Sequence, residues 1–402
     1  MNDTPSAPHG VVATDVCGSA AQPVERSRPS AAYIYMDAMR ALCAIGVALS
    51  HVWSLLIGDY VPTTNLVVRM LYFLAGFGHA GVVLFFVLSG YWITRSVVTR
   101  TAAGAWSWGG YLIDRLARLL VVLVPVLLVG GSLDYIAAVG LESTTLHDQT
   151  GSYMIRVPHE RSLSVQTLLG NLLFLQGLVV PPFGSNGPLW SLAYEFWFYV
   201  WFPALWLLAR HRRPSLALLA LALGAAFPDL ALGFLTWSCG SLLFFAERAA
   251  RRRARVWTWL GRHALLPAIL VSGGTLFWLR ASGYFWLDGL VALSFAAFLL
   301  TLIAADPPIP GAVMPFATFG SRASFSLYAT HFPVVAFVAT LVVDRVRPQP
   351  DAASVSLAYA VLAGCALLAW FFARVTEART DVVRHAARRI ILRGTSDAER
   401  GA

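Results

Sequence analysis

The sequence predicts an all-α protein, a polytopic integral membrane bundle of about ten transmembrane helices. Of its 402 residues, 57% are hydrophobic and only 13% are charged, and this charged fraction is about half that of a typical soluble domain. The mean hydropathy is +0.65. Long apolar runs recur along the chain, and most approach the roughly 20 residues that a helix needs to cross a bilayer.

Ten apolar runs are the candidate membrane spans. The runs at 215–229 and 231–246 are short for spanning helices, and only Pro228 and Asp229 mark a turn between them. We expect two short spans here, because a single span would place the next basic cluster on the outside. The ten runs cover residues 33–57, 70–94, 116–139, 190–209, 215–229, 231–246, 263–280, 284–304, 324–343 and 355–375.

Arginine clusters orient these spans, because basic residues concentrate in cytoplasmic loops. Four clusters flank apolar runs: Arg95 to Arg118, Arg210 to Arg213, Arg248 to Arg255 and Arg374 to Arg393. If all four face the cytoplasm, the ten runs alternate consistently and both termini are cytoplasmic. Counting residues 165–182 as a further crossing would break this alternation, so we expect that segment to be re-entrant or interfacial.

The ends of the chain differ from its apolar middle. Residues 1–30 lack the apolar core of a signal peptide and are expected to form a disordered cytoplasmic tail. Residues 31–380 form the predicted membrane domain, and 381–402 a basic cytoplasmic tail. The net charge of +9 does not indicate nucleic-acid binding, because the arginines cluster at the ends of apolar runs. The four cysteines show no metal-ligand spacing, and no metal site is predicted.

Two ionisable residues, Arg40 and His51, lie on the first predicted span. They are eleven positions apart, which is about three helical turns, so both face one side of the helix, roughly 16 Å apart along its axis. Asp37 lies one turn before Arg40. Ionisable groups inside a membrane span are costly and indicate a functional site. The alternative is structural: Arg40 pairs with Asp37, and His51 satisfies a polar contact.

Arg115 and Arg118 lie where the third span leaves the predicted cytoplasmic side. Their i, i+3 spacing places both guanidinium groups on one helix face. Such a pair suits a phosphorylated ligand that arrives from the cytoplasm. Arginines at this position are also ordinary topology signals.

Two later spans carry further buried polar groups. Glu195 lies among aromatic residues several positions after Gly187 and Pro188, and its carboxylate requires a partner, for which Arg40 or His51 is a candidate. His331 lies within the ninth span, where a hydrogen-bonded structural role is as plausible as a catalytic one. Motifs of α/β-hydrolases, P-loop proteins and zinc proteases are absent from the sequence.

Together these residues resemble the membrane acyltransferase 3 family, which includes O-antigen and exopolysaccharide O-acetyltransferases, Nod-factor acetylases and macrolide O-acyltransferases. Five runs carry the resemblance in the family's order: DAMRALCAIGVALSHVW, FFVLSGYWITRS, RLARLLVVLVP, NGPLWSLAYEFWFY and SFSLYATHFPV. The chain departs from the family pattern at two places. Ala329-Thr330 precedes His331 where an aromatic residue is common, and Glu377-Ala378-Arg379 stands where Glu-Lys-Pro or Glu-Arg-Pro is usual.

The resemblance implies ten transmembrane helices with cytoplasmic termini, an acyl-CoA donor on the cytoplasmic side and an acceptor hydroxyl reached from the other side. By motif position, His51 resembles the family's essential histidine and Arg40 its partner arginine. Arg115 and Arg118 resemble its donor-side pair. We further expect Asp37 and Glu195 in the catalytic set, and an acceptor site formed by Trp190, Ser191, Tyr194 and His331.

These observations favour an O-acyltransferase of a bacterial inner membrane. It would move an acyl group, in the first instance acetyl, from acyl-CoA to a saccharide or lipid-linked glycan, with His51 as general base or transient acyl carrier. No permanently bound cofactor is expected, since acetyl-CoA is a substrate. One alternative is a transporter in which Arg40, His51 and Glu195 relay protons or anions, although no repeated halves are visible. Another is a structural subunit of a polysaccharide assembly complex.

Overall fold

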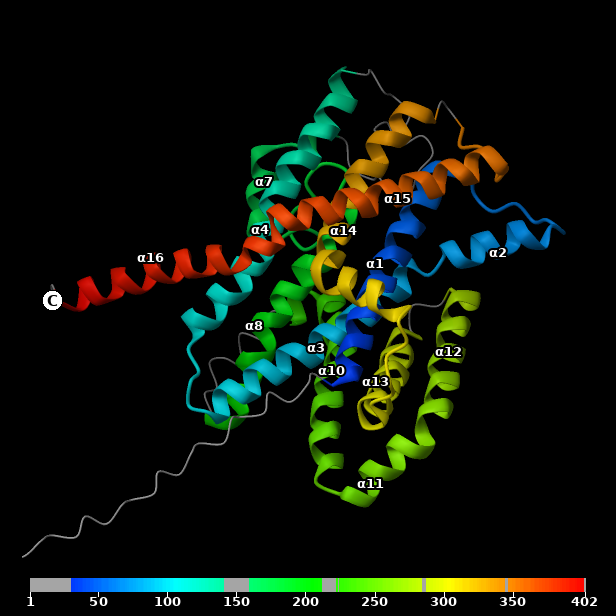
Figure 1. Cartoon of the computed structure of the whole chain (residues 1–402). Helices are drawn as coiled ribbons and strands as arrows, with labels where there is room; N and C mark the ends of the chain where they lie inside the picture. Colours follow the sequence, from blue (N-terminus) through cyan, green and yellow to red (C-terminus); the bar gives the residue numbers. More distant parts are fainter. Residues whose placement is uncertain are drawn as a thin grey trace, which may run out of the picture.

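A computed structural model describes residues 30–140, 159–211, 222, 224–283, 287–343 and 346–400. The regular secondary structure of these residues is helical, apart from one isolated bridge between Gln176 and Val180. The described helices follow one another along the chain (Figure 1). They are α1 (Ala31–Leu56), α2 (Leu66–Ala75), α3 (Gly78–Ala102), α4 (Trp108–Tyr135), α6 (His159–Ser162), α7 (Val165–Leu172), α8 (Trp190–His211), α10 (Pro228–Arg251), α11 (Ala254–Trp259), α12 (Leu265–Ser282), α13 (Asp288–Ala305), α14 (Val313–Val342), α15 (Ala352–Val375) and α16 (Thr380–Arg400).

Eight segments of the described chain are long and apolar enough to cross a membrane. They confirm the predicted all-α polytopic bundle. The 22-residue helix α8 matches the predicted run 190–209, although its aromatic residues and Glu195 make it less apolar. Most of the predicted run 215–229 lies outside the described residues, as does the N-terminal tail. The basic C-terminal segment forms α16 as far as Arg400.

Two predicted boundaries differ from the structure. The run 70–94 is divided into α2 and α3, because Arg280 donates to the carbonyls of Phe73 (3.0 Å) and Tyr72 (2.8 Å) at the end of α2. The second short span is in fact α10, with 24 residues, because Pro228 occupies its first position, where a missing N–H costs nothing. The segment 165–182 contains only the eight-residue helix α7, too short to cross a bilayer, as expected.

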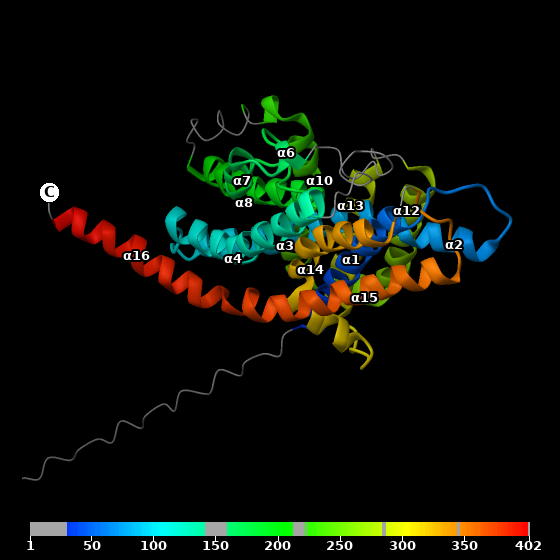
Figure 2. The same ribbon diagram turned by 90° about the horizontal axis from the view of Figure 1, so that it is seen from above.

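The helices pack in layers around α1. Seen from above, α1, α3, α4 and α14 lie between α7 and α8 on one side and α15 with α16 on the other (Figure 2). Small residues permit the closest contacts. A side chain at Gly320 of α14 would collide with the carbonyl of Asp37 on α1, and one at Gly240 of α10 would collide with that of Val87 on α3. Close contact between α1 and α14 is what aligns the polar residues of the two helices.

Polar contacts divide the loops between two ends of the bundle. At one, which we name the basic end, Ser30 donates to Asp306 (2.6 Å), and Arg100 and Arg388 both pair with Asp114 (2.8 and 2.7 Å). At the other, the far end, His79 pairs with Asp288 (2.8 Å) and Arg347 with Asp59 (3.1 Å). Each contact joins loops or helix ends that alternating crossings would place on one side of a membrane.

Candidate active site

A pair of histidines lies near the far end of α1 and α14. His51 Nδ1 is 2.8 Å from His331 Nε2, and the two rings are nearly parallel, with an interplanar angle of 14°. His331 is fully buried, and its Nδ1 lies 2.9 Å from the carbonyl oxygen of Leu327. Phe332 packs edge-on against His51.

The hydrogen bonds assign the tautomers of this pair. A carbonyl can only accept, so Nδ1 of His331 carries the proton and its Nε2 is the acceptor for His51. Nδ1 of His51 therefore donates, which leaves Nε2 of a neutral His51 unprotonated. The pair thus presents an imidazole nitrogen that can accept a proton.

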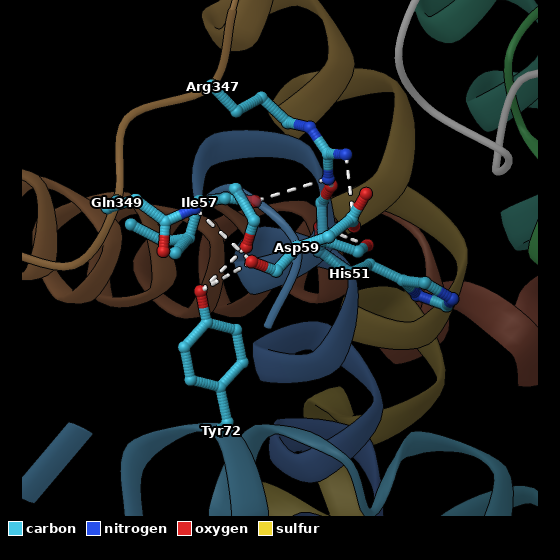
Figure 3. Close-up of polar contacts among 8 residues, drawn as sticks. His51, Ile57, Asp59, Tyr72, Arg347 and Gln349 are labelled. Carbon is cyan, nitrogen blue, oxygen red and sulfur yellow. Dashed lines mark hydrogen bonds and ion pairs between the residues drawn. The ribbon is translucent and has the colours of Figure 1, made fainter. Parts of the chain in front are cut away.

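The last turn of α1, just beyond His51, is held by Arg347. Its guanidinium donates to the carbonyls of Ser54 and Ile57 and pairs with Asp59 (Figure 3). A cation that satisfies terminal carbonyls stabilises the end of a helix. This contact fixes the end of the helix that carries His51.

Arg40 lies about three turns before His51 on α1 and lines a small cavity at the centre of the bundle, of about 80 Å³. Its guanidinium is 3.5 Å from the carboxylate of Asp37. Arg118 and Glu195 line the same cavity. We name it the central cavity. Arg40 and His51 occupy one helix as predicted, but they are too far apart to contact one small group.

Hydroxyl groups, and not the predicted cations, are the hydrogen-bond partners of Glu195. Ser89 Oγ donates to Glu195 Oε1 at 2.7 Å, Tyr199 donates to the same oxygen, and Trp237 Nε1 donates to Ser89. Within the described residues no ion pair joins Glu195 to Arg40 or His51, although Arg40 lines the same cavity as Glu195. α3 brings Ser89 closer to this carboxylate than α1 brings either cation.

A larger cavity of about 510 Å³, which we name the basic pocket, opens at the basic end. Arg115 and Arg118 both line it, as their spacing predicted. Arg115 stacks over Tyr111, with its guanidinium carbon 5.3 Å from the ring centroid. Arg118 lines the central cavity as well, so it links the two. The other charged residues of the basic pocket are Arg100, Asp114, Arg322, Arg374, Glu377, Asp381 and Arg384.

The four residues predicted to bind an acceptor do not converge. His331 is the partner of His51. Ser191 is buried and hydrogen-bonds to the hydroxyl of Tyr328 and to the carbonyl of Pro188. Trp190 and Tyr194 line a third cavity, which Ser191 does not line. Neighbouring residues at the start of α8 therefore face different parts of the structure, because successive side chains of a helix point about 100° apart.

Sequence reasoning missed two residues of this region. Tyr328 lines the central cavity and packs 6.1 Å, ring to ring, from His331; its i, i+3 spacing from that histidine could have indicated this. Glu377, given little weight because its motif departs from the family pattern, lines the basic pocket and accepts hydrogen bonds from the amide (2.9 Å) and hydroxyl (2.6 Å) of Ser326. Nothing in its local sequence indicates that partner.

Comparison with known proteins identifies the family of this chain. A family model described as an acyltransferase domain, that of acyltransferase 3, matches residues 33–374. No match was found among curated proteins or among solved structures. The matched region contains both histidines, the central cavity and the arginines of α4. The chain belongs to the acyltransferase 3 family and is a membrane acyltransferase.

Proposed function

We propose that the protein transfers an acetyl group from acetyl-CoA to a hydroxyl of a saccharide acceptor. The observation that carries this is the histidine pair, with its hydrogen bond of 2.8 Å between rings and its defined tautomers. A neutral imidazole with one free nitrogen is the group that general-base activation of a hydroxyl requires. The family membership supports acyl transfer as the reaction.

The basic pocket is suited to the donor. Its volume of about 510 Å³ is within the usual range for small-molecule sites. Arg115, Arg118, Arg322 and Arg374 offer guanidinium groups, which bind phosphates bidentately. Trp370 provides an aromatic face in the same wall. We assign the phosphates and adenine of coenzyme A to this pocket, which makes the basic end cytoplasmic and places both termini in the cytoplasm of a bacterium's inner membrane.

The arm of the donor would reach inward from Arg118. That residue lines both the basic pocket and the central cavity, and Tyr328 connects the central cavity to the histidine pair. Because Arg40 lies roughly 16 Å from His51 along the helix, we assign Arg40, with Asp37 and Glu195 nearby, to holding this arm. At this spacing Arg40 is too far from His51 to stabilise charge at the reacting carbonyl as well.

In the proposed reaction, His51 Nε2 takes the proton of the acceptor hydroxyl as its oxygen attacks the thioester carbonyl. The C–S bond then breaks, and the coenzyme A thiolate takes the proton from His51. While His51 is protonated, its Nδ1–H continues to donate to His331, which keeps the ring oriented. In a variant of this scheme His51 carries the acyl group transiently, and a trapped acyl-histidine would distinguish the two.

The direct test supplies radiolabelled acetyl-CoA to membranes that contain the wild-type protein or the variant His51→Ala. We expect covalent label in saccharide with the wild type alone, while both proteins bind coenzyme A. Uptake of solute into vesicles without esterification would instead identify a transporter. Equal labelling by the two proteins would remove His51 from the mechanism.

A further inference from the structure

The third cavity is the largest of the three, at about 880 Å³, and the proposed donor path does not use it. It lies at the far end, where α3, α8, α10 and α13 begin. We name it the α10 cavity. Its lining residues are His79, Val82, Val83, Phe86, Trp190, Tyr194, Asp229, Leu232, Gly233, Leu235, Thr236, Cys239, Asp288 and Gly289.

Polar groups gather where these helices begin. His79 Nε2 lies within hydrogen-bond distance (2.8 Å) of the Asp288 carboxylate, and both residues line the cavity. Asp229, in the first turn of α10, is exposed. Within the described residues, no hydrogen bond or ion pair satisfies the Asp229 carboxylate, the Tyr194 hydroxyl or the Trp190 N–H, all of which line the cavity. One acceptor and two hydrogen-bonding groups on aromatic rings thus remain available to a ligand.

The rest of the cavity is apolar and follows the membrane-spanning part of α10. Leu232 and Leu235 are 62% and 66% exposed, although they lie on a helix apolar enough to span a bilayer. Cys239 continues the same face one turn further on. Polar groups at one end and an aliphatic strip along the span match an amphiphile better than a water-soluble molecule.

The α10 cavity also lies beside the proposed reaction path. Val82 and Phe86 of α3 line both this cavity and the central cavity. At the start of α3, a Cβ on Gly78 would lie 2.6 Å from Ser50, the neighbour of His51. The first turns of α3 therefore contact both the α10 cavity and the turn of α1 that carries His51, at the same end of the bundle.

We propose that the α10 cavity binds the acceptor as a neutral glycolipid, which enters from the bilayer. Its hydroxylated head would contact Trp190, Tyr194 and Asp229, since sugars stack on aromatic rings and donate to carboxylates. Its chain would lie along Leu232, Leu235 and Cys239. The carboxylates of Asp229 and Asp288 disfavour an anionic head group at this end. This inference rests on the proposed acyl transfer, of which it names the acceptor class.

Photo-crosslinking tests occupancy without relying on activity. The probe is a dodecyl glucoside with a diazirine on its chain, added to protein in phosphatidylcholine nanodiscs. We expect labelling of the peptide that contains Leu232, Leu235 and Cys239, and we expect excess dodecyl glucoside to prevent it. In Asp229→Asn, the part of the labelling that excess dodecyl glucoside prevents should be several-fold smaller. Labelling that excess dodecyl glucoside does not reduce would mean ordinary lipid contact and would overturn the proposal.

A transfer assay with matched variants provides the second arm. Leu232→Trp would fill the cavity, whereas Leu242→Trp places the same bulk on an equally exposed leucine (58%) outside it. We expect at least a tenfold loss of transfer to dodecyl glucoside in Leu232→Trp alone, with coenzyme A binding retained as evidence of folding. Equal transfer by both variants, or wild-type preference for free glucose, would overturn the glycolipid assignment. Loss of transfer in every protein, including the wild type, would instead count against the proposed function.

Discussion

The two ends of this bundle hold their polar residues in different ways. The basic pocket is wide and open and carries several arginines from different helices, including Arg100, Arg115, Arg322 and Arg374. The histidine pair at the far end has one hydrogen bond between its rings and one to a carbonyl. A ligand held by many cations loses only part of its affinity when one is removed. A proton acceptor fixed by a single chain of hydrogen bonds has no substitute, so substitutions of the histidine pair should have larger effects than substitutions of the pocket arginines.

The largest effect is expected for His51→Ala. General-base assistance is typically worth about 100- to 10,000-fold in rate, so kcat for acetyl transfer should fall by that order. The measurement is initial rate with radiolabelled acetyl-CoA in proteoliposomes. Coenzyme A affinity should not change, because His51 does not line the basic pocket. A variant that keeps more than a tenth of wild-type kcat would contradict the role.

His331→Ala should have the next largest effect, since His331 orients the base without contacting the reacting atoms in our scheme. Partners that orient metal-binding histidines are commonly worth about 10- to 100-fold, and His331 holds the ring of His51 by the same kind of hydrogen bond. We expect kcat to fall by that amount with an unchanged KM for the donor. His331→Gln, which can still accept from His51, should recover part of the loss. If the glutamine variant were as impaired as the alanine variant, packing would explain the effect better than the hydrogen bond.

At the basic end, Arg118→Ala should weaken donor binding. A hydrogen bond to a charged group contributes about 1.5–3 kcal/mol, which corresponds to roughly 10- to 100-fold in Kd. Equilibrium binding of radiolabelled coenzyme A checks this. Arg115→Ala should lose less, because Arg115 already donates to Ser96 (3.1 Å) and stacks on Tyr111. A larger loss of affinity in Arg115→Ala than in Arg118→Ala would show that the donor does not pass Arg118, which lines both cavities.

The smallest effect is expected for Arg347→Ala, which removes the cation at the end of α1. Contacts of this kind contribute about 0.3–2 kcal/mol to stability, so the unfolding midpoint in detergent should fall by a few degrees, with a several-fold lower kcat. Arg69→Ala, at an exposed site on α2, is the control. Equal shifts in the two variants would show that Arg347 has no special role in holding His51.

Several features of the fold were predictable because they depend on local periodicity and composition. α1 begins and ends within two residues of the predicted run 33–57, and the non-spanning segment near 165–182 followed from the arginine clusters. The division between α2 and α3 was not predictable, because it depends on Arg280, about 200 positions away in the chain. The pairing of Glu195 with Ser89 depends in the same way on which helix packs nearest.

By itself, the sequence determined an all-α membrane bundle, its family, and the helix faces that carry Asp37, Arg40 and His51. These follow from hydropathy, from motif order and from the 100° step of a helix. Only the tertiary structure decided that His331 is the partner of His51, that Arg118 joins two cavities, and that Trp190 and Ser191 face different surroundings. A sequence specifies which way a side chain leaves its own helix, but its partner depends on close contacts such as that of Gly320 with Asp37, through which one helix packs against another.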